Sequence, residues 1–316
     1  MTLRDWLGTF RVRCGIGRRN YRISPGLYAV GTPGGASPVL VSANYKLTFD
    51  SLRRELDGLD CWILILDTDG VNVWCAAGEG TFGTDELIER IGLTGLHEIV
   101  SHRTLILPQL GASGVCAHEV KERSGFSVVY GPVRARDIKS FIASGNAATE
   151  AMRRVKFTMR DRLVLTPVEL LAAAKMSLSV FGVLFLLNLF AARPFGMADF
   201  AAYAGAVCAG AFVTPLLLPF VPGRAFSWKG WLVGLCWAAF IIRHNGWFAS
   251  GSVFLLSGYA LLLPSLSAYL AMNFTGSSTY ASHSGVKREM KIAVPLLLAS
   301  SVIGSFLLLI QSLIAI

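Results

Sequence analysis

The second half of the chain has very few acidic residues. Residues 165–316 contain three of the 20 aspartates and glutamates and eight of the 29 lysines and arginines, whereas residues 1–164 contain all the others. So little charge in a chain that is 53% hydrophobic is typical of a membrane protein. We therefore expect a globular domain over residues 1–164 and an all-α transmembrane domain over residues 165–316.

The six cysteines lack the spacing of a metal cluster or a disulfide framework, because none forms a C-x-x-C pair. Any electrons that the protein uses must then come from another protein. The glycine-rich turn Gln109–Gly114 fits neither G-x-G-x-x-G nor G-x-x-x-x-G-K-[ST], so nucleotide binding has weak support. Nucleic acid is not an expected partner either, since the net charge of +9 arises beside apolar runs or among acids and no nucleic-acid module is recognisable.

No apolar core of signal-peptide length follows Met1, so the first domain is expected to stay in the cytoplasm. A capping box at Thr166–Glu169 predicts the start of the first membrane helix. Basic residues lie mostly on one side of the expected spans, which predicts a cytoplasmic (inner) membrane protein with its C-terminus outside. Sparse polar residues in the spans favour an anchor or docking platform over a transporter. Five spans are predicted, at about residues 176–191, 200–220, 230–242, 247–272 and 292–314.

In the first domain, apolar runs alternate with amphipathic segments. This alternation predicts an α/β Rossmann-like fold, with a mostly parallel sheet covered on both faces and ligands bound beyond the carboxyl ends of its strands. The expected strands are Gly26–Val30, Pro38–Val41, Cys61–Leu66, His97–Ser101 and Phe126–Tyr130, and the expected helices are Leu47–Leu56, Asp85–Ile91 and Arg134–Ala143.

The stretch Asn72–Gly78 follows the apolar strand Cys61–Leu66 and predicts a short helix. Asn72 is a good N-cap, and Gly78 and Gly80 should end the helix after about two turns. Cys75 then lies in the first turn, where free backbone N–H groups and the helix dipole favour a thiolate. On spacing alone, a small buried hydrophobe is the favoured interpretation of Cys75.

Two sequence motifs resemble the cap-helix signature of the HgcA family, the membrane-bound corrinoid proteins of mercury methylation. They are NVWCAAG at Asn72–Gly78 and GTFGTDEL at Gly80–Leu87. Their soluble domain is related to the corrinoid subunit of the acetogenic iron–sulfur methyl carrier. The family usually has lysine where this chain has Glu79. Further similar stretches are Pro25–Gly31, Ser42–Leu56, Leu105–Val115, Val128–Asp137 and Met272–Tyr280.

The resemblance implies that Cys75 is the lower axial ligand to the cobalt of a cobalamin-type corrinoid, and that the methyl group passes to inorganic Hg(II) to give methylmercury. It also implies a ferredoxin-like [4Fe–4S] partner of the HgcB type for cobalt reduction, and methyl-tetrahydrofolate, through a methyltransferase, as the methyl donor. The rival interpretations are a membrane-anchored corrinoid carrier or sensor that does not methylate mercury, and a transporter with a regulatory domain. The expected corrinoid-binding residues are Thr68, Asn72, Val73, Trp74, Cys75, Ala76, Gly111, Val115, Tyr130, Gly131 and Pro132.

Overall fold

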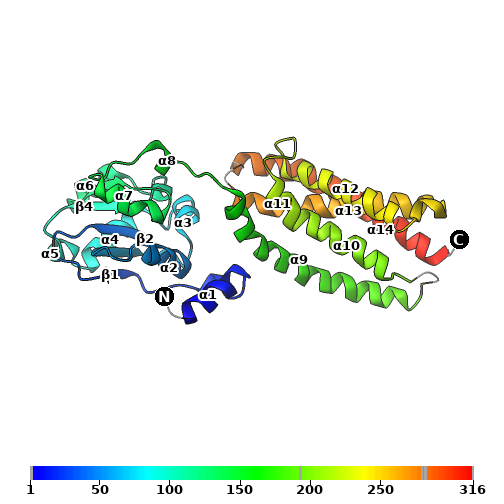
Figure 1. Ribbon diagram of the computed structural model, residues 1–316, viewed down its shortest axis with the longest axis horizontal. Coiled ribbons are helices and arrows are strands. Elements are labelled where there is room, and N and C mark those ends of the chain that lie inside the picture. The colour runs from blue at the N-terminus through cyan, green and yellow to red at the C-terminus, as the bar shows by residue number, and fades with distance from the viewer. Residues whose placement is uncertain (1–2, 192–193, 279, 281–282, 315–316) are drawn as a thin grey trace. The chain divides into compact units, whose positions relative to one another are not determined.

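The computed structural model describes residues 3–191, 194–278, 280 and 283–314. Its internal contacts divide the chain into two compact units (Figure 1). The first unit comprises Met1–Val12 and Ile16–Lys156, and the second comprises Arg13–Gly15 and Phe157–Ile316. Each unit is a different kind of structure, an α/β domain and a helical bundle.

The first unit contains one five-stranded sheet in the order β1-β3-β2-β4-β5. β1 runs antiparallel to β3, while β2, β3, β4 and β5 are mutually parallel. The predicted mostly parallel sheet is therefore confirmed, with one antiparallel edge strand. The strands are β1 (Gly26–Val30), β2 (Val39–Ala43), β3 (Cys61–Leu66), β4 (Thr104–Leu107) and β5 (Ser127–Tyr130).

Both faces of this sheet are covered, because the apolar side chains of β2, β3 and β4 point alternately to two separate cores. One core contains residues of α2 (Lys46–Glu55) and α7 (Ile138–Ala143). The opposite core contains residues of four helices: α3 (Val73–Glu79), α4 (Thr84–Leu93), α5 (Leu96–Ile99) and α6 (Ala117–Ser124). The remaining α-helices of this unit are α1 (Leu3–Arg13) and α8 (Glu150–Arg153).

The strand predicted at His97–Ser101 is wrong, since this segment contains the short helix α5. Gly95 adopts a left-handed conformation with φ 58° and opens that helix. The Arg103 guanidinium then donates to the carbonyl oxygens of His97 and Val100 at 3.1 and 2.9 Å. These two carbonyl groups therefore have hydrogen-bond donors without pairing to a neighbouring strand. The strand lies further along the chain, at Thr104–Leu107. The prediction failed because a short apolar run does not by itself distinguish a helix from a strand.

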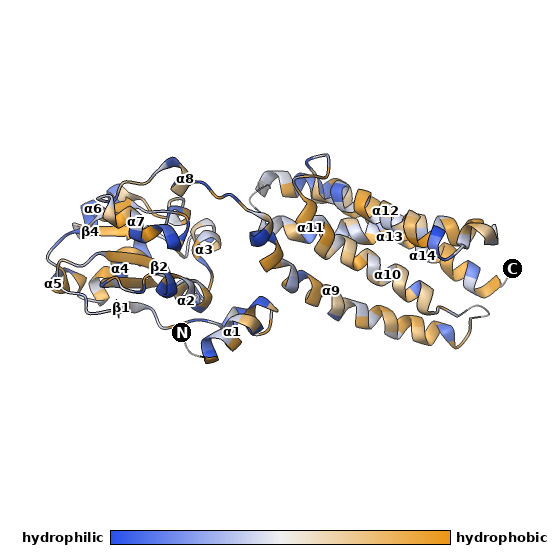
Figure 2. Cartoon of the chain, viewed as in Figure 1, coloured by the Kyte–Doolittle hydropathy of each residue, from blue (hydrophilic) through white to orange (hydrophobic). Residues whose placement is uncertain are grey.

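The second unit is a bundle of long apolar helices, orange along most of their length in Figure 2. Among the described residues, four helical stretches are long and apolar enough to cross a membrane, with mean hydropathy between 1.7 and 2.3: Met159–Asn188, Met197–Leu217, Val253–Gly276 and Ser284–Ile314. The helices of this unit are α9 (Met159–Asn188), α10 (Met197–Cys208), α11 (Thr214–Leu217), α12 (Phe226–His244), α13 (Val253–Asn273) and α14 (His283–Ile314), with a π-helical segment at Ala209–Val213.

Four of the five predicted spans are thus supported by length and composition, and the third is not. That span lies within α12, which is helical over 19 residues but contains Lys229 near its start and Arg243 with His244 at its end. α12 nevertheless packs along α13, where the Ser267 hydroxyl donates to the Gly230 carbonyl at 2.8 Å. The crossing of the membrane by α12 remains a prediction.

The first helix of the bundle begins earlier than predicted. Thr158 and Asp161 form the capping box of α9, in which the Thr158 N–H donates to the Asp161 carboxylate at 2.8 Å. Pro167 therefore lies inside α9 instead of opening it. A proline frees the carbonyl four residues earlier, and here the Thr166 hydroxyl donates to that carbonyl, of Leu163, at 2.9 Å. This local bond lets the helix continue through the predicted start.

Candidate functional site

The carboxyl ends of the four parallel strands lie at one edge of the sheet, because parallel strands share a direction. β2 continues into α2 on one face, whereas β4 leads towards α6 on the opposite face. At the neighbouring carboxyl ends of β2 and β4, the chain therefore leaves the sheet towards opposite faces. In α/β sheets such a point leaves a crevice in which ligands bind.

Asn44, the residue directly after β2, organises this edge. Its side-chain oxygen accepts hydrogen bonds from the backbone N–H groups of Thr68 and Gly70 at 3.1 and 2.9 Å, and from the Thr68 hydroxyl at 2.9 Å. Its side-chain nitrogen donates to the Asp67 carboxylate at 2.8 Å. Asn44 is only 1% exposed, so this one amide fixes the loop that follows β3.

The loop at residues 67–71 is held from a second side by α4. Glu86 accepts a hydrogen bond from the Asp67 N–H at 2.7 Å and is itself paired with Arg90 at 2.9 Å. Asp69 has φ 54° and Gly70 has φ 74°, so two consecutive left-handed residues reverse the chain. This tight, well-bonded reversal determines where the next helix, α3, begins.

α3 has the ends that the sequence predicts. The Asn72 side chain caps it by accepting from the Cys75 N–H at 3.2 Å, and Gly80 ends it in a left-handed conformation with φ 94°. The Asn72 amide nitrogen also lies 3.4 Å from the Cys75 sulfur, within hydrogen-bonding distance of a sulfur acceptor. Cys75 is half-buried and its neighbour Trp74 is 40% exposed. The first turn of α3 therefore presents a sulfur atom and an indole ring at the carboxyl edge of the sheet.

The glycine-rich turn after β4 packs directly beneath α3. A Cβ atom at Gly111 would lie 2.6 Å from the Phe82 ring, and one at Gly114 would lie 2.2 Å from the Phe82 carbonyl oxygen and 3.0 Å from the Ala77 Cα. The close approach that glycine permits here is therefore to the segment containing α3 and Phe82. The turn supports the helix, and its predicted contact with a corrin ring remains a prediction.

The segment after β5 joins the same support. The Tyr130 hydroxyl donates to the Val115 carbonyl at 2.7 Å, and burial, with a smaller contribution from Cys116, raises the pKa of Tyr130. Tyr130 thus stays a protonated donor near neutral pH. Gly131 and Pro132 are buried, and the Gly131 N–H donates to the Leu107 carbonyl at 2.7 Å.

The predicted site residues fall into two groups. Asn72, Trp74, Cys75 and Tyr130 keep exposed surface that a ligand could contact. The other members have side chains or backbone enclosed within the protein, where they shape the support of α3; these are Thr68, Val73, Ala76, Gly111, Val115, Gly131 and Pro132.

Sequence reasoning missed Asn44 and Glu86, which hold the loop before α3. For Asn44 a signal exists, because an asparagine directly after a buried strand commonly bonds to nearby backbone instead of joining the ladder. Glu86 resembles any acid in the first turn of a helix. Its contact with Asp67 depends on how α4 packs, which the sequence pattern does not reveal.

The remaining cysteines of the first unit differ from Cys75. Cys61 lies in β3 with no exposed surface, and burial, assisted by Asp60, raises the pKa of its thiol to about 11. Cys116 is exposed and precedes α6. Within the described residues, no group of three or more His, Cys, Asp or Glu side chains could hold a metal ion.

Comparison with known proteins gives matches to the first unit. Residues 17–142 match the family described as the CO dehydrogenase/acetyl-CoA synthase delta subunit. The acetyl-CoA decarbonylase/synthase complex subunits gamma of Methanopyrus kandleri and Methanocaldococcus jannaschii are each 32% identical over 127 residues, which is 40% of this chain and 27% and 26% of theirs. Subunit gamma 2 of Methanosarcina thermophila is 34% identical over 111 residues, 34% of this chain and 23% of its own.

This chain spans about a quarter of the length of the curated relatives it matches. The family match ends at residue 142, before α8 and before every helix of the second unit. The α/β unit that carries α3 and Cys75 is therefore similar to part of the subunits of acetyl-CoA decarbonylase/synthase complexes.

Proposed function

We propose that the first unit binds a corrinoid against α3 and that the protein is a corrinoid-dependent methyltransferase. The observation that carries this proposal is the Asn72-capped first turn of α3, which contains both the half-buried Cys75 and the exposed Trp74. Two sequence comparisons support the same proposal: the similarity of residues 17–142 to the CO dehydrogenase/acetyl-CoA synthase delta subunit family, and the NVWCAAG motif.

The chemistry of the available donors fits a corrinoid better than a free metal ion. A metal site made by protein alone needs several converging ligands, and the described residues offer no such group. A corrinoid would bring its cobalt with a ring of nitrogen ligands of its own, so that one further donor from the protein would suffice. The Cys75 sulfur, half-buried at the carboxyl edge of the sheet, is such a donor.

Each residue of the site has a distinct task in this proposal. Cys75 would supply a sulfur ligand to the cobalt, and the Asn72 amide would hold that sulfur in place by a hydrogen bond. Trp74 offers a flat apolar surface to a macrocycle, and the Asn44-bonded loop keeps α3 from shifting. When bound, the corrinoid would supply a cobalt ion that carries the methyl group and gives it up.

We further propose that the methyl acceptor is inorganic Hg(II) and that the product is methylmercury, because the NVWCAAG motif resembles the cap-helix signature of the HgcA family. An electron-rich sulfur ligand suits methyl transfer towards a soft, sulfur-seeking metal ion. Turnover also needs a reductant and a methyl source. A ferredoxin-like [4Fe–4S] protein of the HgcB type and methyl-tetrahydrofolate are the partners that this resemblance suggests.

A membrane-anchored corrinoid carrier or sensor that does not methylate mercury is the second candidate. Glu79, the exposed last residue of α3, favours it, because the HgcA family usually has lysine there. Relative to a neutral residue, a carboxylate at a helix C-terminus is disfavoured by about 0.3–1 kcal/mol. It also replaces the positive charge of the family's lysine with a negative charge.

The test is the absorption spectrum of purified full-length protein in detergent after incubation with cobalamin, followed by a methylmercury assay with a methyl donor, a reductant and Hg(II). We expect a protein-bound corrinoid spectrum and methylmercury formation. Corrinoid binding without methylmercury would favour the carrier. A protein that retains no corrinoid would contradict both candidates.

We propose that the first unit lies in the cytoplasm and that the second unit is anchored in the inner membrane, since Arg224, Lys229, Lys287, Arg288 and Lys291 fall on the side predicted to be cytoplasmic. Arg193 and the chain end at residues 315–316, which the predicted orientation also uses, lie outside the described residues.

Thiol labelling in whole cells checks this orientation, in a background without other cysteines. Ser284→Cys, at the start of α14, should resist a membrane-impermeant reagent, because the reagent does not reach the cytoplasm. Ala249→Cys, between α12 and α13, is the matched control and should be labelled. The reverse pattern would invert the proposed topology.

A further inference from the structure

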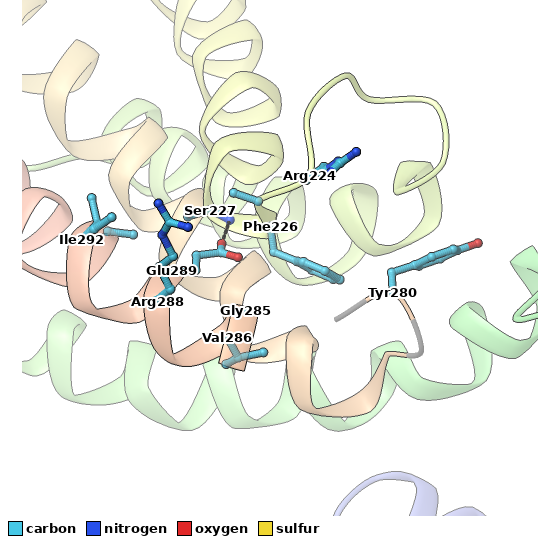
Figure 3. A pocket seen from close by; sticks show the side chains of 11 residues that line it. Arg224, Phe226, Ser227, Tyr280, Gly285, Val286, Arg288, Glu289 and Ile292 are labelled. Atoms are coloured by element: carbon cyan, nitrogen blue, oxygen red, sulfur yellow. Dashed lines mark hydrogen bonds between the residues drawn. The ribbon is translucent and has the colours of Figure 1, made fainter. Parts of the chain in front are cut away.

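A cavity of about 570 Å³ lies in the second unit between the start of α12 and the first turns of α14. Figure 3 shows Phe226 and Ser227 at the start of α12, facing Glu289 and Val286 of α14. A second cavity of about 310 Å³ shares three lining residues with it: Arg224, Phe226 and Tyr280. Nothing in the proposed methyl transfer uses this region.

The polar part of the lining is basic. Arg224 and Arg288 line the cavity, and neither is ion-paired with a carboxylate among the described residues. The one acid of the lining, Glu289, is already engaged, because its carboxylate accepts the Ser227 N–H at 2.6 Å and so caps α12. Two guanidinium groups are therefore available to an anion.

Further cations lie on the same two helices. Lys287 and Lys291 flank Arg288 on α14, and Lys229 lies in the first turn of α12, where it donates to the Leu218 carbonyl. Basic residues concentrated at the ends of apolar helices are typical of the cytoplasmic membrane surface. Basic pockets between helices on that side bind the headgroups of anionic lipids.

Most of the remaining lining is apolar, and it continues along α14. Phe226, Val286 and Ala293 contribute to the wall, and Ile292 does so while remaining 58% exposed. One turn further along α14, Leu296 is 66% exposed. Trp228 and Trp231 stack with ring centroids 5.6 Å apart in the first two turns of α12, as expected of residues at a membrane interface.

We propose that this cavity binds an anionic phospholipid, with its headgroup in the part of the cavity that Arg224 and Arg288 line and an acyl chain along the exposed apolar face of α14 at Ile292 and Leu296. Guanidinium groups suit phosphate because they can donate two parallel hydrogen bonds. The apolar wall favours a lipid over a water-soluble phosphate, since a soluble ion would gain nothing from it. The bound lipid would then join the starts of α12 and α14.

Native mass spectrometry of the full-length protein tests this proposal. The protein is reconstituted in nanodiscs of phosphatidylcholine with phosphatidylglycerol, then released, and the retained lipid is counted. We expect selective retention of phosphatidylglycerol, and a loss of at least about tenfold in its apparent affinity in the double variant Arg224→Gln, Arg288→Gln, because charged hydrogen bonds are lost. Arg243→Gln, at the opposite end of α12, is the matched control and should retain the lipid.

Three further measurements make the outcome decisive. The charge-preserving variant Arg224→Lys, Arg288→Lys should retain part of the selectivity, which guards against a fold defect in the glutamine variant. Equal retention by the wild type and the glutamine variant would overturn the proposal, as would an equal loss in Arg243→Gln. Displacement of the lipid by added inorganic phosphate would instead assign the cavity to a soluble anion and overturn the lipid.

Discussion

Replacing Cys75 with alanine is expected to abolish methyl transfer and to change the spectrum of the bound corrinoid, while the first unit stays folded. Loss of a hydrogen-bonding partner around a metal ligand typically costs about 10–100-fold in affinity or activity. Removal of the ligand itself should cost more than that. The fold should tolerate the change because Cys75 is only half-buried in the first turn of α3, and alanine is a good helix residue.

The matched control is Cys116→Ala. Cys116 is also a free cysteine at the start of a short helix, where it is the N-cap residue of α6. Unlike Cys75, it is exposed, and no asparagine amide among the described residues is hydrogen-bonded to its sulfur. This variant should keep its activity and its corrinoid spectrum. The measurements are methylmercury formed at matched corrinoid occupancy and the visible spectrum of each variant. If Cys75→Ala turned over normally with an unchanged spectrum, the axial sulfur would be disproved.

What the sequence predicts well about this site is local. The Asn72 cap, the Gly80 end and the placement of Cys75 in the first turn all depend on residues within a few positions of one another. Strands β1, β2 and β3 were likewise predictable from short apolar runs, and helix α2 from the helical spacing of its apolar residues. These parts of the fold follow from neighbouring residues alone.

What the sequence does not reveal depends on partners distant in the chain. Thr158 and Thr166 both begin acceptable capping boxes, and only the satisfied Leu163 carbonyl shows why the helix continues through Pro167. Gly111 and Gly114 suggest a ligand, yet the atoms that crowd them belong to Phe82 and Ala77. In each of these cases, a contact with another segment determines the outcome.

Asn44 is the clearest such case, and Asn44→Leu is expected to have the largest effect on the order of α3. Leucine has a similar volume but accepts no hydrogen bond, so the buried N–H groups of Thr68 and Gly70 would lose their acceptor. Each unsatisfied buried group costs about 1–3 kcal/mol. The free energy that holds residues 67–79 in place should therefore fall by about 2–6 kcal/mol, and α3 would open more often while the sheet remains.

Hydrogen exchange of the full-length protein in detergent measures this effect at the backbone amides of α3. A loss of about 2 kcal/mol corresponds to roughly 30-fold faster exchange through local opening. Thr68→Val, which removes one hydroxyl and keeps the backbone bond to Asn44, should produce a smaller acceleration. Asn20→Leu makes the same substitution at an exposed asparagine of the same unit and should leave α3 unchanged. If the amides of α3 exchanged at wild-type rates in Asn44→Leu, the loop would be fixed by Glu86 and the turn residues instead, and Asn44 would not be the residue that positions Cys75.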